Sequence, residues 1–345
     1  MEETLPNSAR LFRVLFYWRD MMKAWVHHET GTPDVLGLVD RPQPRPARGE
    51  VLVRNRAVGL NPVDWKFISW GHAAWKWPHI PGVDGAGEIV ELGEGIAHLR
   101  LGARVAYHND LPRPGSFAEY TVIPARAAIP LPDALSFEAA AALPCPGLTA
   151  IQAIEKSPLW PGAHVLLTGA SGAVGGALLQ LARSRGWIVH AVCSAAQSAR
   201  VLRLGAATVL DYHQDDWREI AAKRAANQPL NAIFDMVSGE HAASLAPLLT
   251  ANGHLVCIQD RQEKTPLPPF TTTISLHEVG LNAMHAHADD AQWSRLVGAG
   301  AAMASDIVSG RFDPQIIDVE SFDRLPVALA RLEHGPNPGN RVVVL

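Results

Sequence analysis

The residues with the clearest chemical potential form a glycine-rich turn, Gly169-Ala-Ser-Gly172-Ala-Val-Gly175-Gly176, directly after an apolar segment at residues 165–168. Glycines at this spacing let the backbone turn tightly and approach a bound group closely. If a helix begins in the turn, its free N–H groups and its dipole stabilise a pyrophosphate. A tight turn that binds nothing can share this pattern, so its meaning depends on the neighbouring elements.

Those neighbouring elements alternate between strands and helices. Short apolar strands are expected at residues 164–169, 187–194, 207–212, 232–237 and 254–259, with helical stretches between most of them. Such alternation predicts right-handed βαβ units and a parallel sheet. The glycine turn follows the first strand, where a doubly wound dinucleotide fold binds phosphate. The candidate phosphate-binding residues are Gly169, Ser171, Gly172, Ala173, Val174 and Gly175.

The end of the second strand indicates which nicotinamide dinucleotide the site would take. A fold that prefers NAD usually has Asp or Glu about 20 residues after the turn, bonded to the ribose 2′-hydroxyl. Here the strand ends at Ser194, and no acid precedes Asp211. Ser194 and Arg200 could bind a 2′-phosphate instead, whereas Arg203 fits a solvated helix face. The sequence therefore predicts NADPH as the cofactor.

The segments outside this α/β unit predict a second domain. Residues 23–131 contain short β-rich runs broken by Gly and Pro, which indicates a barrel-like β domain. One long helix is expected at residues 136–156, with Ser136 as its N-cap. Two helices near residues 292–309 and 325–333 and a strand at 341–345 are too little for another nucleotide fold. We expect this tail to return to the β domain, which makes the α/β unit an insertion.

Composition excludes several classes of protein. The length of 345 residues suits two domains, and the net charge of −4 gives no basic field that would attract nucleic acid or an anionic membrane. No apolar run reaches the roughly 18 residues needed to span a bilayer. Cys145, Cys193 and Cys257 are too widely spaced for a disulfide framework or a CxxC metal site. We expect a soluble cytoplasmic protein whose partners include neither nucleic acid nor membrane.

The first residues form no recognisable targeting signal. Arg13 and Arg19 interrupt the short apolar stretch, which excludes a signal peptide or an anchor. Met21 and Met22 directly precede the first strand-like pattern. We therefore expect residues 1–21 to be an N-terminal extension, with a functional amphipathic helix as the alternative.

Five motifs in a fixed order resemble the medium-chain dehydrogenase/reductase superfamily, and within it the zinc-independent quinone oxidoreductase (zeta-crystallin-like) branch. They are Gly59-Leu-Asn-Pro-Val-Asp-Trp-Lys66, Pro81-Gly-Val-Asp-Gly-Ala-Gly-Glu-Ile-Val90, Gly115-Ser-Phe-Ala-Glu-Tyr120, Leu143-Pro-Cys-Pro-Gly-Leu-Thr-Ala150 and the glycine turn. The resemblance covers nearly all of residues 22–345. It implies an α/β fold in which a Rossmann doubly wound parallel sheet is inserted in a GroES-like β-barrel domain.

The resemblance also implies how the chain is divided and assembled. Residues 22–140 and 286–345 would form the GroES-like catalytic domain, and residues 141–285 the Rossmann NADPH-binding domain. Substrate and nicotinamide would meet in the cleft between the two domains. By analogy with the family, we expect a homodimer.

Zinc-dependent members of this superfamily hold a catalytic zinc with Cys, His and Cys, at positions that correspond here to Asn61, Val83 and Cys145. Valine cannot bind a metal, and one thiolate with an amide does not make a zinc site. We therefore expect no metal, and hydride transfer from NADPH to a quinone or an α,β-unsaturated carbonyl. Asn61 is the candidate hydrogen-bond donor to the substrate oxygen, and Lys66 is a second donor or proton source. A structural asparagine and a solvated lysine are the simpler alternatives.

Further cofactor contacts follow from the resemblance alone. Thr149 would lie near the nicotinamide or a phosphate, and Tyr212 would flank the 2′-phosphate. The lysine that often accompanies this tyrosine is absent, since Gln197 or Ser198 occupies its position. Val237 and Ile258, which end the fourth and fifth predicted strands, would line the dinucleotide crevice.

Other features leave alternatives open. A dedicated enoyl or enone reductase, or a non-catalytic NADPH-binding protein of the crystallin type, would have the same fold. No tyrosine has a lysine four residues later, which excludes a short-chain dehydrogenase. His285, His287 and Asp289 form the best metal-like cluster, but their spacing fixes no third ligand and no metal is expected there. The tryptophans between residues 65 and 77 could form an aromatic wall over the substrate or simply pack in a loop.

Overall fold

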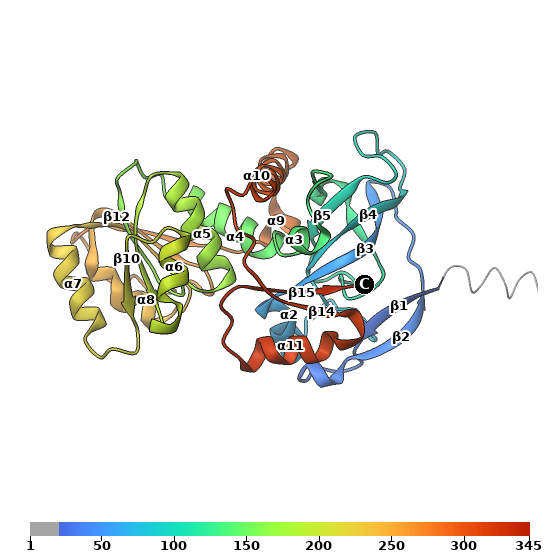
Figure 1. Ribbon diagram of the computed structural model, residues 1–345, viewed down its shortest axis with the longest axis horizontal. Helices are drawn as coiled ribbons and strands as arrows, with labels where there is room; N and C mark the ends of the chain where they lie inside the picture. Colours follow the sequence, from blue (N-terminus) through green and yellow to red (C-terminus); the bar gives the residue numbers. More distant parts are fainter. Residues whose placement is uncertain (1–20) are drawn as a thin grey trace, which may run out of the picture.

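The computed structural model describes residues 21–345, which form two lobes around two large sheets (Figure 1). The predicted N-terminal extension lies outside the described residues except for Met21. That residue begins strand β1 (Met21–Val26), which pairs antiparallel with β2 (Gly37–Pro42). Among residues 21–345, no helix has both the length and the apolar character needed to cross a bilayer.

One lobe contains a seven-stranded sheet that is built from both ends of the chain. Its order is β14-β15-β3-β4-β5-β7, and β6 pairs with the first half of β3, on the edge that β15 pairs with farther along. The last strand, β15, pairs antiparallel with β3, so the C-terminal tail closes the sheet that the early strands begin. The bounds are β3 (Glu50–Leu60), β4 (Asp84–Leu92), β5 (Arg104–His108), β6 (Tyr120–Pro124), β7 (Ile129–Pro130), β14 (Ile316–Ser321) and β15 (Asn340–Val344).

The other lobe contains a six-stranded sheet in which every neighbouring pair is parallel. Its order, β10-β9-β8-β11-β12-β13, is that of a doubly wound Rossmann fold and reverses between β8 and β11. This confirms the predicted fold class. The strands are β8 (His164–Leu167), β9 (Ile188–Cys193), β10 (Thr208–Asp211), β11 (Leu230–Asp235), β12 (Leu249–Cys257) and β13 (Ser275–Glu278).

Helices cover this parallel sheet and connect its strands (Figure 1). Strand β8 leads directly into α5 through the glycine turn. The connections between β9 and β12 carry α6, α7 and α8, and the connection from β12 to β13 carries no α-helix. The bounds of these helices are α5 (Ala173–Ser184), α6 (Ser198–Leu204), α7 (Trp217–Asn227) and α8 (Glu240–Leu245).

The single long helix predicted at residues 136–156 is wrong, because the structure has two helices there. Helix α3 (Phe137–Ala141) ends before Leu143, and α4 (Pro144–Glu155) begins immediately after it. Pro144 has no N–H to donate to the preceding turn, so the helical hydrogen bonds of α3 cannot continue through it. The predicted N-cap is correct, since the Ser136 hydroxyl accepts from the Ala139 N–H at 3.2 Å.

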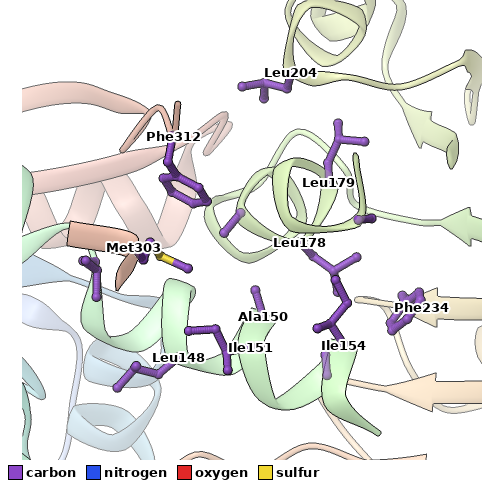
Figure 2. Close-up of a cluster of buried hydrophobic side chains, with 14 of the residues drawn as sticks. Leu148, Ala150, Ile151, Ile154, Leu178, Leu179, Leu204, Phe234, Met303 and Phe312 are labelled. Atoms are coloured by element: carbon purple, nitrogen blue, oxygen red, sulfur yellow. The ribbon is translucent and has the colours of Figure 1, made fainter. Parts of the chain in front are cut away.

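A shared hydrophobic core joins the two lobes. Helix α4 packs against α5 and against α10 (Asp290–Val308). In Figure 2, Leu148 and Ile151 of α4, Leu178 of α5 and Met303 of α10 lie in one buried cluster. Two shorter helices also lie near the site, α2 (Pro62–Trp70) and α9 (Ala283–His287). Helix α11 (Leu325–His334) precedes β15. The cluster therefore fixes the relative position of the elements that line the site.

Candidate active site

The two lobes enclose a cavity of about 480 Å³, a typical size for a small-molecule or cofactor site. Asn61 reaches it from the N-cap of α2 and Lys66 from the middle of that helix, while Cys145 and Thr149 reach it from α4. The glycine turn forms another wall, and the segments after β12 and β13 close the remaining side. Of the predicted site residues, the cavity is lined by Asn61, Lys66, Thr149, Gly169, Gly172, Ala173, Val174, Gly175 and Ile258.

The glycine turn leaves its backbone open on the side of the cavity. Gly169 has φ of +60°, a conformation that suits glycine. A Cβ on Gly172 would touch only the Gly169 carbonyl oxygen, at 3.4 Å, whereas a Cβ on Gly175 would lie 2.2 Å from that same oxygen. The backbone at Gly172 is therefore open to a ligand, and Gly175 lets the helix pack closely against the turn. No side chain caps the N-terminus of α5, so its first N–H groups can bind phosphate.

The remaining predicted cofactor residues lie outside the cavity, toward the end of the sheet where the adenosine half of a dinucleotide would bind. Ser194 follows β9 and Tyr212 follows β10. Val237 follows β11 and is 58% exposed. All three are at the carboxyl ends of their strands, on the same edge of the sheet as the glycine turn.

Arg200 is engaged with the protein itself. Its Nη1 donates to the backbone carbonyl of Ser171 at 2.8 Å, and its Nη2 donates to Oε1 of Gln315. Burial lowers the pKa of Arg200. The guanidinium thus connects the glycine turn to the C-terminal part of the chain. Neither Ser171 nor Arg200 lines the cavity.

A buried carboxylate positions the candidate donor Asn61. Asn61 Nδ2 donates to Asp84 Oδ2 at 2.9 Å, and the backbone N–H of Cys145 donates to the same oxygen at 2.8 Å. Asp84 is only 1% exposed, and burial raises the pKa of its carboxyl well above the usual range. Sequence reasoning missed Asp84, although it directly follows Val83 in the motif Pro81-Gly-Val-Asp84.

A second buried carboxylate holds the backbone of the same region. Asp64 accepts hydrogen bonds from the backbone N–H of Asn61 at 2.7 Å and of Val83 at 3.1 Å. Burial raises the pKa of Asp64 to about 7, against the opposing effect of these two bonds. Asp64 therefore links the loop before α2 to the loop before β4.

The three positions that hold zinc in related enzymes come together here, but their chemistry does not suit zinc. Val83 offers no ligand atom, and Asp84 already accepts two N–H groups. Burial first, and then the negative charges of Asp84 and Asp64, raise the pKa of the Cys145 thiol well above its usual range, which disfavours the thiolate that zinc needs. Among residues 21–345, no group of three His, Cys, Asp or Glu side chains could hold a metal ion.

The best metal-like cluster in the sequence, His285, His287 and Asp289, makes other contacts in the structure. His285 and His287 lie on helix α9 rather than on a strand. Asp289 caps α10 by accepting from the Gln292 N–H at 2.7 Å. His285 turns toward the cavity wall, where its Nε2 lies 3.1 Å from Nδ1 of His108.

Lys66 and the aromatic segment form the mouth of the cavity. Lys66 Nζ donates to Gln259 Oε1 at 2.8 Å, which bridges the two lobes, and burial lowers the pKa of its ammonium group. The lysine also lies 6.0 Å from the ring centroid of Trp70, which lines the cavity. Trp75 instead stacks on His79 with the ring centroids 4.0 Å apart. Trp70 therefore lines the cavity, whereas Trp75 packs within its own loop.

His108 is a cavity residue that sequence reasoning also missed. It ends β5, lines the cavity and is 4% exposed. Burial lowers the pKa of His108 to about 3. The only signal in the sequence is a histidine at the end of a strand, and the strand pairing that brings it beside Asp84 cannot be read from one sequence.

The chain is similar to known protein families and to individual proteins. Residues 47–133 match the alcohol dehydrogenase GroES-like domain family, and residues 204–343 match the zinc-binding dehydrogenase family. A chloroplast envelope quinone oxidoreductase homolog of Arabidopsis thaliana is 32% identical over 253 residues, which cover 71% of this chain and 74% of that protein. A quinone oxidoreductase of Rattus norvegicus is 31% identical over 243 residues, covering 69% and 73% of the two chains.

A solved structure shows the same overall arrangement. The quinone oxidoreductase from Coxiella burnetii matches with a TM-score of 0.78 and 25% identity, over 94% of this chain and 99% of that one. The motifs, the two sheets and these relatives lead to one conclusion. The chain belongs to the quinone oxidoreductase branch of the medium-chain dehydrogenase/reductase superfamily, and it is an oxidoreductase that uses a nicotinamide cofactor.

Proposed function

We propose that this protein is an NADPH-dependent, metal-free reductase of quinones or α,β-unsaturated carbonyl compounds. One observation carries the proposal: the Asn61 amide, held by Asp84, stands in the cavity where zinc-dependent relatives have a metal ligand. A fixed N–H donor can stabilise a developing negative oxygen, as a Lewis acid does in the metal enzymes. Such an oxygen develops when hydride adds to a quinone or to the β-carbon of an enone.

The residues of the chain divide the work as follows. The glycine turn and the N-terminus of α5 would bind the pyrophosphate, while Thr149 and Ile258 would contact the nicotinamide half. NADPH, when bound, supplies the hydride. Asn61 would hold the substrate oxygen with its second amide hydrogen, since the first is bonded to Asp84. Lys66 would be a second hydrogen-bond donor or proton source for the substrate. The apolar walls of the cavity would exclude water.

NADPH rather than NADH is proposed on the residues at the ends of β9 and β10. Ser194 and Tyr212 lie where a ribose 2′-phosphate would reach the sheet edge, and no acidic side chain follows β9 before Asp211. Arg200 would contribute by holding the turn and by its positive charge. Val237 would cover the adenosine side of the crevice.

The predicted division and assembly of the chain also stand as proposals. We place the GroES-like domain at residues 22–140 and 286–345 and the Rossmann domain at residues 141–285, supported by β14 and β15 in the first sheet. Edge strand β13 leaves one side of the parallel sheet without a partner among residues 21–345, which favours a homodimer. A cytoplasmic location fits the three cysteines, none of which forms a disulfide among the described residues.

The test is NADPH oxidation by purified protein with a small quinone and, separately, with an enone. Turnover with the quinone, or with both acceptors, supports the proposal. Turnover with a single enone and no quinone would instead favour a dedicated enoyl or enone reductase. Tight NADPH binding without oxidation of either acceptor would contradict catalysis and favour a crystallin-type binding protein.

A further inference from the structure

His108 stands beside the candidate donor Asn61 at the wall of the cavity. In the antiparallel pair of β4 and β5, His108 is directly opposite Asp84, so their side chains lie on the same face of the sheet. Asp84 is the residue that holds the Asn61 amide. A substrate oxygen bound by Asn61 would therefore lie close to the imidazole of His108.

The imidazole of His108 connects the cavity to a second histidine. Its Nδ1 lies 3.1 Å from Nε2 of His285, and the two rings stack with their centroids 5.4 Å apart. Nε2 of His108 has no hydrogen-bond partner among the described residues, and it is not one of the completely buried unpaired polar atoms. His108 lines the cavity, so this nitrogen is free to bond a substrate there in the proposal below.

The second histidine, His285, contacts His108 and is also partly exposed at the protein surface. His285 is partly exposed on α9, and its ring lies 4.9 Å from the ring of Trp293. Burial lowers the pKa of His285 to about 4. The charge of Asp110 opposes this shift, and the charges of Arg126 and Arg113 reinforce it. Both rings are thus neutral at pH 7, and each carries one proton.

We propose that His108 and His285 form a relay that carries a proton from solvent to the substrate oxygen, with His108 as the catalytic acid. This inference rests on the proposed function, because it supplies the proton that a hydride acceptor needs. In this relay His285 donates its Nε2–H to Nδ1 of His108 across the 3.1 Å contact, and the proton of His108 is then on Nε2. In this pair of tautomers the two rings form a donor chain that ends at the substrate oxygen.

The step is balanced in protons and electrons. Hydride brings two electrons to the substrate, and the electron pair displaced from the carbonyl appears on its oxygen. The proton on Nε2 of His108 moves to that oxygen, the proton on Nε2 of His285 moves to Nδ1 of His108, and solvent supplies one proton to Nδ1 of His285. The rings end in the opposite tautomers, and exchange with water in the open cavity restores them.

The first test compares His108→Phe and His285→Phe with a matched control, His254→Phe. His254 and His277 form a second stacked histidine pair, with Nδ1 and Nε2 3.0 Å apart, on β12 and β13 and outside the cavity. We expect kcat for NADPH oxidation to fall about 100-fold in His108→Phe, which is within the usual range for loss of a general acid. We expect a fall of about 10-fold in His285→Phe and no change in His254→Phe. NADPH affinity should be the same in all four proteins.

Two further measurements keep the inference falsifiable. The solvent deuterium isotope effect on kcat should change in His108→Phe, and His108→Gln, which keeps an N–H donor, should recover part of the activity. Unchanged kcat and isotope effect in a folded His108→Phe would overturn the relay, while wild-type turnover would still support the proposed function.

A spectroscopic measurement tests the histidine pair without turnover. In a ¹⁵N-histidine NMR titration, assigned with the two variants, both rings should be Nε2–H tautomers and should stay neutral down to about pH 5. A proton on Nδ1 of His108, or a charged ring at pH 6.5, would overturn the relay. Failure of the wild type to oxidise NADPH with any acceptor would instead contradict the proposed function.

Discussion

Asn61 is central to the proposed chemistry because only one of its N–H groups remains without a partner among residues 21–345. Its backbone N–H is bonded to Asp64, and one amide hydrogen is bonded to Asp84, so the remaining amide hydrogen is the one available in the cavity. In the proposed mechanism, the Asn61 amide is thus an oriented, uncharged hydrogen-bond donor at a position that corresponds to a zinc ligand in zinc-dependent members of the superfamily. The residue types were readable from the sequence, but the role of Asp84 was not, because Asp84 reaches Asn61 through the pairing of β3 with β4.

Replacing Asn61 by alanine tests this role. We expect Asn61→Ala to lower kcat by about 10²-fold, the usual effect of removing one donor to a developing oxyanion. NADPH affinity should change little, because Asn61 does not belong to the phosphate-binding turn. Steady-state kinetics and NADPH titration are the measurements, with a thermal unfolding curve as the control for folding. Unchanged turnover would remove Asn61 from the mechanism.

Asp64 makes stability depend on pH in a direction that can be stated in advance. Its pKa is about 7 in the folded protein and near 3.8 in the unfolded chain, so the fold binds the extra proton between these values. The contribution of Asp64 to stability is complete below pH 4 and is lost as the pH rises through 7.

The comparison with Asp64→Asn isolates this effect from the histidines, which act in the opposite direction. Between pH 4.5 and 7, the wild type should lose stability relative to Asp64→Asn by up to about 1.4 kcal/mol per pH unit. Urea unfolding at several pH values measures this difference. Parallel curves for the two proteins would show that Asp64 is ionised in the fold.

Substitutions of Arg200 and Tyr212 separate two contributions to NADPH binding: support of the glycine turn and contact with the 2′-phosphate. Its guanidinium holds the Ser171 carbonyl and Gln315, so Arg200→Ala should loosen the glycine turn and weaken both NADPH and NADH, by about 10-fold or more. Tyr212→Ala should weaken NADPH alone. Fluorescence titration with both cofactors gives the ratio, and the wild type should bind NADPH more tightly. Equal wild-type affinities would contradict the NADPH assignment.

At the scale of elements, the strand, turn and helix at residues 164–184 were the most readable part of the chain. Apolar runs, glycines and an amphipathic helix each gave a local signal there. Two other elements lacked such signals. Edge strand β13 is mostly exposed and polar, and the break between α3 and α4 depends on prolines inside an otherwise helical composition. Local patterns show buried, regular elements best, because burial imposes the pattern.

A matched pair of glycine substitutions tests the turn as an element. A methyl group at Gly172 has room, whereas one at Gly175 would lie 2.2 Å from the Gly169 carbonyl oxygen. Gly172→Ala should therefore fold normally but bind NADPH about 10-fold or more weakly, because the methyl group occupies the approach to the pyrophosphate. Gly175→Ala should lower the unfolding temperature as well.

The control for this pair is Gly298→Ala in helix α10, where a Cβ meets nothing within 4 Å. This change should stabilise the helix by roughly 0.5–1 kcal/mol and leave NADPH binding unchanged. Calorimetry and NADPH titration provide both readouts. Full NADPH affinity in a folded Gly172→Ala would contradict the assignment of the turn.

At the scale of the whole molecule, the site forms because the C-terminal part of the chain packs against the first domain. Strand β15 completes the sheet that β3 begins, and α4, α5 and α10 share one core (Figure 2). The contacts of Lys66 with Gln259 and of His108 with His285 then join residues nearly two hundred positions apart. The sequence motifs could indicate the inserted domain, but no single motif could indicate these contacts, since they depend on how the lobes pack.

The most direct test of the account is the metal content of the purified protein, measured together with its turnover. If Asn61 and its neighbours replace the metal, elemental analysis will find well under one zinc per chain. NADPH oxidation with a quinone or enone will then be the same before and after treatment with a chelator. One zinc per chain, with activity that is lost on chelation and restored by zinc, would contradict the account.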